Sequence, residues 1–134
     1  MTDLVFFYGT LMSGFKRPGR SRIDPKLTPV GRGSIAATLF DLGIYPAAIP
    51  SSDQRVVGEV HRMSDPASVL AALDEIEGYR PGQPDASLYT RVETLVTFDD
   101  RRVEPAWAYF YNAPLGGAQR IESGDYLQYL QVKP

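Results

Sequence analysis

The 134-residue chain has no cysteine and only one histidine, His61. The lack of cysteine excludes disulfides, thiolate nucleophiles, zinc ribbons and iron–sulfur ligation. It also fits a reducing compartment, so we expect a cytoplasmic protein. A single histidine excludes metal sites built from several histidines, and any serine–histidine catalytic pair would depend on His61 alone.

Long apolar runs and an excess of positive charge are also missing. The longest apolar run, Leu4 to Tyr8, is far too short to cross a bilayer, and the acidic N-terminus has no basic segment typical of a secretory signal. Fourteen basic and sixteen acidic side chains give a net charge of −2. That balance lacks the basic surface of a nucleic-acid or anionic-membrane binder. We therefore predict no nucleic-acid partner and no membrane partner, and the oligomeric state stays open.

The composition is that of a globular protein with many turns. Apolar residues make up 43% and charged residues 22% of the chain, and there are 12 glycines and 11 prolines. The length predicts a single domain over residues 1–134. Apolar alternation predicts about six strands, mostly antiparallel. The clearest cover residues 4–8, 30–42, 56–63, 88–98 and 103–112. Residues 43–50 are expected to form an apolar loop held by two prolines, and residues 119–130 to begin with a helical turn.

One helix is predicted clearly. Ser64 or Asp65 can cap it, Pro66 occupies the favoured first position, and Gly78 supplies the left-handed residue after its end. The fold class is therefore α+β: a curved or barrel-like, mostly antiparallel sheet with this helix packed at one side.

Glu77, the last residue of this helix, lies on an unexpected face. The apolar arc consists of Val69, Leu70, Leu73 and Ile76. At about 100° per residue, with Leu70 set at about 0° and Leu73 at about 300°, Glu77 falls inside the arc at about 340°. Asp74 lies just off its edge, and Glu75 points to solvent.

A carboxylate in this arc is disfavoured when ionised. Burial raises its pKa, and the partial negative charge at the helix C-terminus raises it further. A pKa near neutrality is typical of groups that transfer protons. Two structural alternatives stay open: a frayed last turn would let Glu77 reach solvent, or Glu77 would form an ion pair with an arginine such as Arg91.

A second candidate site follows the first strand, at Tyr8, Gly9, Thr10 and Leu11. Gly9 permits a tight turn, which can aim successive backbone amides into a cavity and bind a carboxylate or an oxyanion. An ordinary strand-ending turn is the alternative. The residues after it, 13–29, are expected to form a long basic surface loop with room for a short helical piece. This loop is either functional or a solvated connector.

An aromatic stripe marks the strand over residues 103–112. Trp107, Tyr109 and Tyr111 share one of its faces, and Tyr89 and Arg91 share a face of the partner strand. Such a stripe fills either a core or a pocket, and buried tyrosine hydroxyls need hydrogen-bond partners.

These pieces, in this order, resemble the γ-glutamylcyclotransferase-like family, which includes γ-glutamylamine cyclotransferases and avirulence-induced plant relatives. The resemblance covers most of the chain, and the ordered set is its specific signal. The matching pieces are Tyr8 to Leu11, Tyr45 to Ala47, Gly58 to Val60, Leu73 to Tyr79, Tyr89 to Arg91, Ala106 to Tyr111 and Ser123 to Tyr126.

The resemblance implies a small mixed barrel with helices, and roles for particular residues. Glu77 stands where the family has its catalytic glutamate, in agreement with its place on the helix. Residues Tyr8, Gly9, Thr10 and Leu11 correspond to the loop that lines the substrate site. Tyr89 corresponds to a pocket residue, and we include Tyr111 with it among the predicted substrate-binding residues. The basic loop over residues 12–22 and the loop after Glu77 depart from better-characterised members, so the substrate's identity stays open.

The implied reaction is intramolecular and needs no metal or cofactor. The α-amine of a γ-glutamyl group attacks its own γ-carbonyl, releasing 5-oxoproline and a free amine or amino acid. Glu77 would act as general base and then as general acid. Three alternatives remain: a binding module for γ-glutamyl or carboxylate ligands, a protein-interaction domain using residues 15–22, and a hydrolase using His61. The last is disfavoured because no glycine-flanked serine lies nearby, and we expect His61 to be an exposed strand residue.

Overall fold

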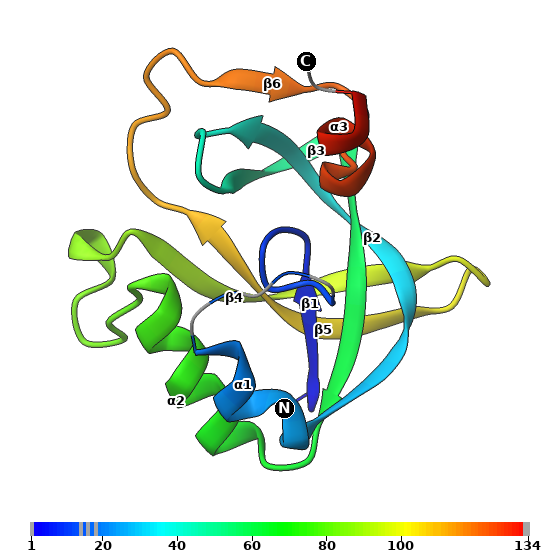
Figure 1. The fold of residues 1–134 in the computed structure, drawn as a ribbon, viewed down its shortest axis with the longest axis vertical. Helices are drawn as coiled ribbons and strands as arrows, with labels where there is room; N and C mark the ends of the chain where they lie inside the picture. The colour runs from blue at the N-terminus through cyan, green and yellow to red at the C-terminus, as the bar shows by residue number, and fades with distance from the viewer. Residues whose placement is uncertain (1, 14, 16, 18, 133–134) are drawn as a thin grey trace.

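Five strands close into a barrel in the computed structural model, which describes residues 2–13, 15, 17 and 19–132 (Figure 1). The strands are β1 (Leu4–Phe7), β2 (Leu27–Asp41), β3 (Pro46–Met63), β4 (Tyr89–Phe98), β5 (Val103–Tyr111) and the short β6 (Gln119–Ile121). They follow the order β3-β1-β5-β4-β2-β6, and an additional pairing of β2 with β3 closes the barrel. Only β1 and β5 are paired in parallel among the described strands. The predicted α+β class with a mixed, mostly antiparallel barrel is confirmed.

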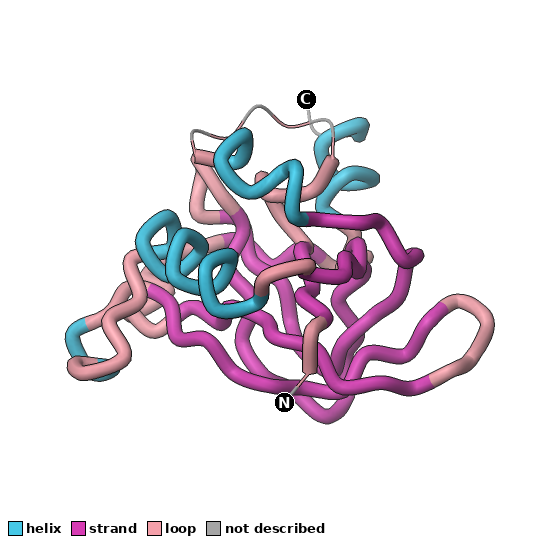
Figure 2. Tube along the Cα trace, turned by 90° about the horizontal axis from the view of Figure 1, so that it is seen from below, coloured by secondary structure: helices cyan, strands magenta, loops and turns pink. Residues whose placement is uncertain are grey.

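The helices gather on one side of the strands, as Figure 2 shows. They are α1 (Arg20–Ile23), α2 (Pro66–Glu77) and α3 (Tyr126–Val132), with short 3₁₀ turns η1 (Asp24–Lys26) and η2 (Pro84–Ala86). Of the described helices, none is both long and apolar enough to span a membrane.

Helix α2 has the ends that the sequence predicts. The Asp65 side chain caps its N-terminus by accepting from the Ser68 amide at 3.4 Å. At the C-terminus Gly78 adopts φ 68°, a left-handed conformation that glycine tolerates best. The Tyr79 amide then bonds back to the Asp74 carbonyl at 2.8 Å, which is typical of a closed helix end. The predicted alternative of a frayed last turn is therefore wrong.

Two segments differ from their prediction. Residues 46–50 form the beginning of β3 and not a loop: Pro46 pairs with Asp41, and Pro50 lies beside a register shift in β2. Proline is tolerated in a sheet at such irregularities because no ladder hydrogen bond is lost. The segment 119–130 begins with β6, which pairs with β2, before it turns into α3.

Strand β1 sets the position of the loop that follows it. All of its residues are buried, as expected for an uninterrupted apolar run. On one side it lies so close to β3 that a Cβ on Gly58 would stand 2.2 Å from the Phe7 carbonyl oxygen. Glycine is thus required there by close approach of the two backbones. The chain turns directly after β1, while Tyr8, Leu11 and Met12 stay buried in the core.

Candidate active site

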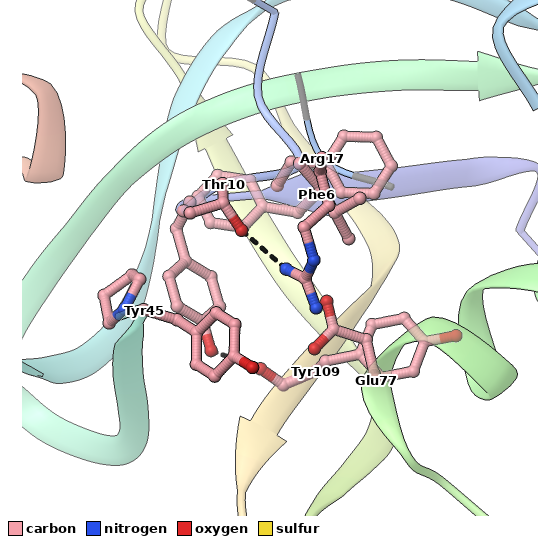
Figure 3. A pocket seen from close by; sticks show the side chains of 11 residues that line it. Phe6, Thr10, Arg17, Tyr45, Glu77 and Tyr109 are labelled. Carbon is pink, nitrogen blue, oxygen red and sulfur yellow. Dashed lines mark hydrogen bonds between the residues drawn. The ribbon is translucent and has the colours of Figure 1, made fainter. Parts of the chain in front are cut away.

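A small cavity lies between the loop after β1 and the end of α2 (Figure 3). Its volume is about 30 Å³, less than a ligand of amino-acid size requires unless side chains move. Its walls are formed by Phe6, Phe7, Tyr8, Gly9, Thr10, Leu11, Arg17, Tyr45, Pro46, Glu77 and Tyr109. The fold thus brings Glu77 together with the whole predicted loop, although they are far apart in the sequence.

Glu77 is half-buried and faces the guanidinium of Arg17 across the cavity (Figure 3). Burial raises the pKa of Glu77 from 4.5 to about 7, and the positive charge of Arg17 opposes this rise. The predicted alternative partner, Arg91, instead bonds to Asp74 at 2.9 Å. Glu77 therefore has the environment predicted from the helix geometry: close to neutral pH it can both accept and donate a proton.

The raised pKa makes stability depend on pH. The native state holds the proton of Glu77 more tightly than the unfolded chain does. The contribution of this proton to the free energy of unfolding is complete below pH about 4.5 and is lost as the pH rises through about 7. The free energy of unfolding changes by up to about 3 kcal/mol as a result. We expect the free energy of unfolding in urea to fall between pH 5.5 and 8.5 for the wild type. The fall should be smaller for Glu77→Gln, which has no carboxyl group at this position. Equal losses in the two proteins would contradict the raised pKa.

The loop after β1 lines the cavity and carries backbone donors that are not used within the described part of the chain. A turn is closed by the Met12 amide, which bonds to the Gly9 carbonyl at 3.0 Å. Within the described part of the chain, no hydrogen bond is donated by the amides of Gly9, Thr10 or Leu11. Gly9 does not need a positive φ; it is required because a Cβ would stand 2.7 Å from Pro46 Cγ. The loop can therefore donate hydrogen bonds to an anion or to a polarised carbonyl oxygen.

Tyr8 is a structural anchor for this loop. Its hydroxyl donates to the Tyr109 carbonyl at 2.7 Å and accepts from the Ala48 amide at 3.3 Å. Burial, Tyr89 and Glu77 all raise the pKa of Tyr8, so its hydroxyl stays neutral. Because its proton is already engaged, Tyr8 contributes to the cavity its ring and position, without a free donor.

Behind the cavity lies a buried polar network centred on Asp74. The carboxylate accepts from the Tyr109 hydroxyl at 2.6 Å and from Arg91 at 2.9 and 3.3 Å. Burial and the bond to Asp74 raise the pKa of Tyr109. The guanidinium of Arg91 also lies 4.7 Å from the ring centroid of Trp107. Asp74 was predicted at the edge of the apolar arc, but it is buried because strands β4 and β5 supply its partners.

Tyr89 and Tyr111 are not among the described residues that line the cavity, although Tyr89 contacts a residue that does. The buried Tyr89 hydroxyl donates to the Pro46 carbonyl at 3.1 Å, and its ring contacts Tyr111 edge-on at 5.3 Å. Burial and the nearby Glu77 raise the pKa of Tyr89. Neither tyrosine is among the described residues that line the cavity. Direct contact of Tyr89 and Tyr111 with a ligand therefore stays a prediction.

Arg17, Tyr45 and Pro46 line the cavity but were not singled out from the sequence as site residues. Arg17 reaches in from the basic loop, with its guanidinium 4.9 Å from the ring centroid of Tyr45. Its Nη1 donates to Thr10 Oγ1 at 2.5 Å. The basic composition of this loop was the only signal for Arg17, since no spacing rule relates it to Glu77.

His61 is buried, and the expectation of an exposed residue is wrong. Its Nε2 lies 3.1 Å from Glu59 Oε1, and its ring packs against Phe7. Burial lowers its pKa. The same Glu59 carboxylate accepts from the Ser13 amide at 2.8 Å. His61 is thus part of a structural contact, since β1 pairs alongside β3 and its Phe7 ring packs against the imidazole.

The chemistry available to this site is acid–base chemistry. Among the described residues, no group of three or more histidine, aspartate or glutamate side chains is placed to hold a metal ion. The cavity instead combines one carboxylic acid of nearly neutral pKa, one guanidinium and a lining loop whose amides donate to no described acceptor.

Comparison with known proteins identifies a family that matches most of the chain. A sequence model described as "Gamma-glutamyl cyclotransferase, AIG2-like" matches residues 5–128. The chain is 33% identical over 124 residues to "Gamma-glutamylcyclotransferase family protein YtfP" from Escherichia coli (strain K12), covering 92% of this chain and 95% of that protein.

Solved structures share the fold. The crystal structure of YkqA from Bacillus subtilis matches with a TM-score of 0.71 and 21% identity, over 98% of this chain and 42% of that longer one. An AIG2-like protein from Mus musculus matches with a TM-score of 0.66 and 20% identity, over 90% of this chain and 86% of that one. From the sequence match over nearly its whole length, the chain belongs to the AIG2-like γ-glutamylcyclotransferase family.

Proposed function

We propose that this protein is a γ-glutamylcyclotransferase that converts a γ-glutamyl amide into 5-oxoproline and a free amine or amino acid. One observation carries the proposal. Glu77 is a half-buried carboxylic acid whose pKa is raised to about 7. It shares a cavity with a loop in which three backbone amides donate to no acceptor among the described residues. The family supports cyclotransferase chemistry in general. Glu77 as the base, the γ-glutamyl substrate and a cytoplasmic location belong to the proposal.

The reaction is a ring closure in which one carboxyl group can move every proton. Glu77 takes a proton from the α-ammonium, and the free amine attacks the γ-carbonyl carbon, forming the new C–N bond. Glu77 donates this proton to the leaving nitrogen and, as a carboxylate again, accepts the second proton from the α-nitrogen. The bond to the leaving nitrogen breaks as the lactam forms, and Glu77 returns the second proton to the released amine. The two protons lost by the α-nitrogen are gained by the leaving amine, so atoms and charges balance without water, metal or cofactor.

The remaining task of the protein is to hold the reactive conformer. Because both reacting groups belong to one molecule, binding of the folded γ-glutamyl group supplies much of the rate enhancement. The amides of Gly9, Thr10 and Leu11 are the candidate donors to the oxygen that becomes negative in the tetrahedral intermediate. Loss of one such donor typically costs about 3–4 kcal/mol of transition-state stabilisation.

A panel of γ-glutamyl compounds tests the proposal. The purified protein should release 5-oxoproline from at least one class among γ-glutamyl amino acids, γ-glutamyl-ε-lysine and γ-glutamyl amines, measured by chromatography. The second candidate is a binding module on the same fold, because the unpartnered loop amides and Arg17 can bind a γ-glutamyl or carboxylate ligand without any proton transfer. A binding module would show a raised melting temperature with a γ-glutamyl compound and no product.

A further inference from the structure

The guanidinium of Arg17 has unused hydrogen-bonding capacity beside Glu77. A guanidinium carries five N–H donors in a planar fork. Among the described residues, Arg17 donates only to Thr10 Oγ1 at 2.5 Å and to the Ile76 carbonyl at 3.4 Å. At least two donors thus remain for a ligand in a cavity that Arg17 itself lines. Its plane is supported by the Tyr45 ring, 4.9 Å away.

Arg17 and Glu77 are neighbours that do not neutralise one another. The charge of Arg17 acts on Glu77 electrostatically, and Figure 3 shows the two head groups facing each other. No ion pair within 4.0 Å joins them among the described side chains. The cavity therefore presents a guanidinium with unused donors next to a carboxyl group that has no ion-pair partner among the described side chains. A zwitterion with a positive and a negative group on the same carbon atom matches this arrangement.

We propose that Arg17 binds the α-carboxylate of the substrate, so that only γ-glutamyl compounds with a free α-carboxylate are accepted. The inference rests on the proposed function. The α-carboxylate and the α-ammonium of the substrate are attached to the same carbon atom. If Glu77 takes its proton from the α-ammonium, the α-carboxylate must therefore lie near Arg17, which borders Glu77. Of the described residues lining the cavity, only Arg17 is cationic. Its fork can bind a carboxylate through two parallel N–H···O bonds.

This assignment also settles the role of the loop amides. With the α-carboxylate on Arg17, the amides of Gly9, Thr10 and Leu11 are left for the γ-carbonyl oxygen. The cavity of about 30 Å³ admits such a ligand only if side chains rearrange. The exposed end of the cavity is the place where this can occur, because Arg17 can exchange its bond to Thr10 for bonds to the incoming carboxylate.

A binding experiment tests Arg17 without catalysis. The probes are 5-oxoproline, which retains the α-carboxylate, and 5-oxoprolinamide, which lacks its charge. Calorimetry should show that the wild type binds the acid about 10- to 100-fold more tightly than the amide, the effect of charge-assisted hydrogen bonds. Arg17→Gln should bind both compounds equally and weakly, and Arg17→Lys should retain only part of the preference.

Arg22→Gln is the matched control. Arg22 is an exposed arginine of the same basic segment, paired only distantly with Glu75 at 3.9 Å. Its loss removes the same charge but should leave the preference for the acid unchanged. If wild type binds both compounds equally, binds neither, or if Arg22→Gln abolishes the preference as Arg17→Gln does, the assignment of Arg17 is wrong.

Turnover separates this inference from the proposed function. With an active γ-glutamyl amide and its α-carboxamide, kcat/KM of the wild type should favour the free acid by a similar factor, mainly through KM. Arg17→Gln should lose that preference. Absence of 5-oxoproline from all substrates overturns the proposed function but leaves the binding result to decide on Arg17. Turnover without preference for the acid overturns the role of Arg17 alone.

Discussion

Glu77→Gln is expected to abolish release of 5-oxoproline while the protein stays folded. The amide has nearly the same shape but can neither accept the proton of the α-ammonium nor return one to the leaving nitrogen. General acid–base catalysis contributes about 10²- to 10⁴-fold to a rate, and here one group performs both transfers. We therefore expect kcat to fall at least about 100-fold, measured by 5-oxoproline formation under saturating substrate.

Glu75→Gln provides the control for this substitution. Glu75 lies two residues earlier on α2 and is exposed, so its loss changes the charge of the same helix without touching the cavity. It should keep wild-type turnover. Circular dichroism should show the same fold for both variants. If Glu77→Gln turns over like the wild type, Glu77 is not the base, and the proposed mechanism fails.

The pH profile gives an independent measure of the same group. Because the pKa of Glu77 is raised to about 7, the basic form needed for the first proton transfer is lost as the pH falls below that value. We expect kcat/KM of the wild type to decline on the acid side of about pH 7. Arg17 holds this pKa down, so Arg17→Gln should move the decline to higher pH.

Asp74→Ala is expected to have the largest effect on stability. The substitution leaves the half-buried guanidinium of Arg91 without its carboxylate and the buried Tyr109 hydroxyl without its acceptor. Breaking a buried pair by removing one partner costs about 3–5 kcal/mol. Because Asp74 and Arg91 keep side-chain exposures of 12% and 18%, we expect a loss near the lower end, about 3 kcal/mol, by urea unfolding.

Removing the partner as well tests the physical cause. In the double variant Asp74→Ala/Arg91→Ala no unpaired charge remains, so part of the lost stability should return relative to the sum of the single substitutions. Strictly additive losses would show that the pair is not coupled. A loss below about 1 kcal/mol in Asp74→Ala would show that solvent replaces the contacts, as at exposed ion pairs.

Local chemistry made α2 and its last residue predictable. Capping by Asp65 and the left-handed Gly78 act within a few residues, so the ends of the helix follow from sequence alone. The apolar arc then places Glu77 toward the protein interior, because the helical period relates residues on one turn. The loop over residues 8–11 was predictable for the same kind of reason, since it ends an uninterrupted buried strand.

The prediction of a loop over residues 43–50 was wrong for residues 46–50, because pairing between strands decides their conformation. Pro46 and Pro50 suggest a loop, yet both belong to β3. The register shift between Ala36 and Ala37 in β2 provides an irregular place beside Pro50. Such a shift is set by how two strands align along their whole length, and no pattern within either segment shows it.

By itself, the sequence determined a barrel-like, mostly antiparallel sheet, the ends of α2, the inward face of Glu77 and the turn over residues 8–11. The tertiary structure alone decided that the loop over residues 8–11 lies beside Glu77, which cation borders Glu77, and which groups satisfy Asp74. The reason is distance along the chain. Arg17 lies 59 residues from the Ile76 carbonyl that it contacts, and Asp74 lies 35 residues from Tyr109. Helical and strand periods relate only near neighbours, whereas the electrostatics of this site arise from groups that closure of the barrel brings together.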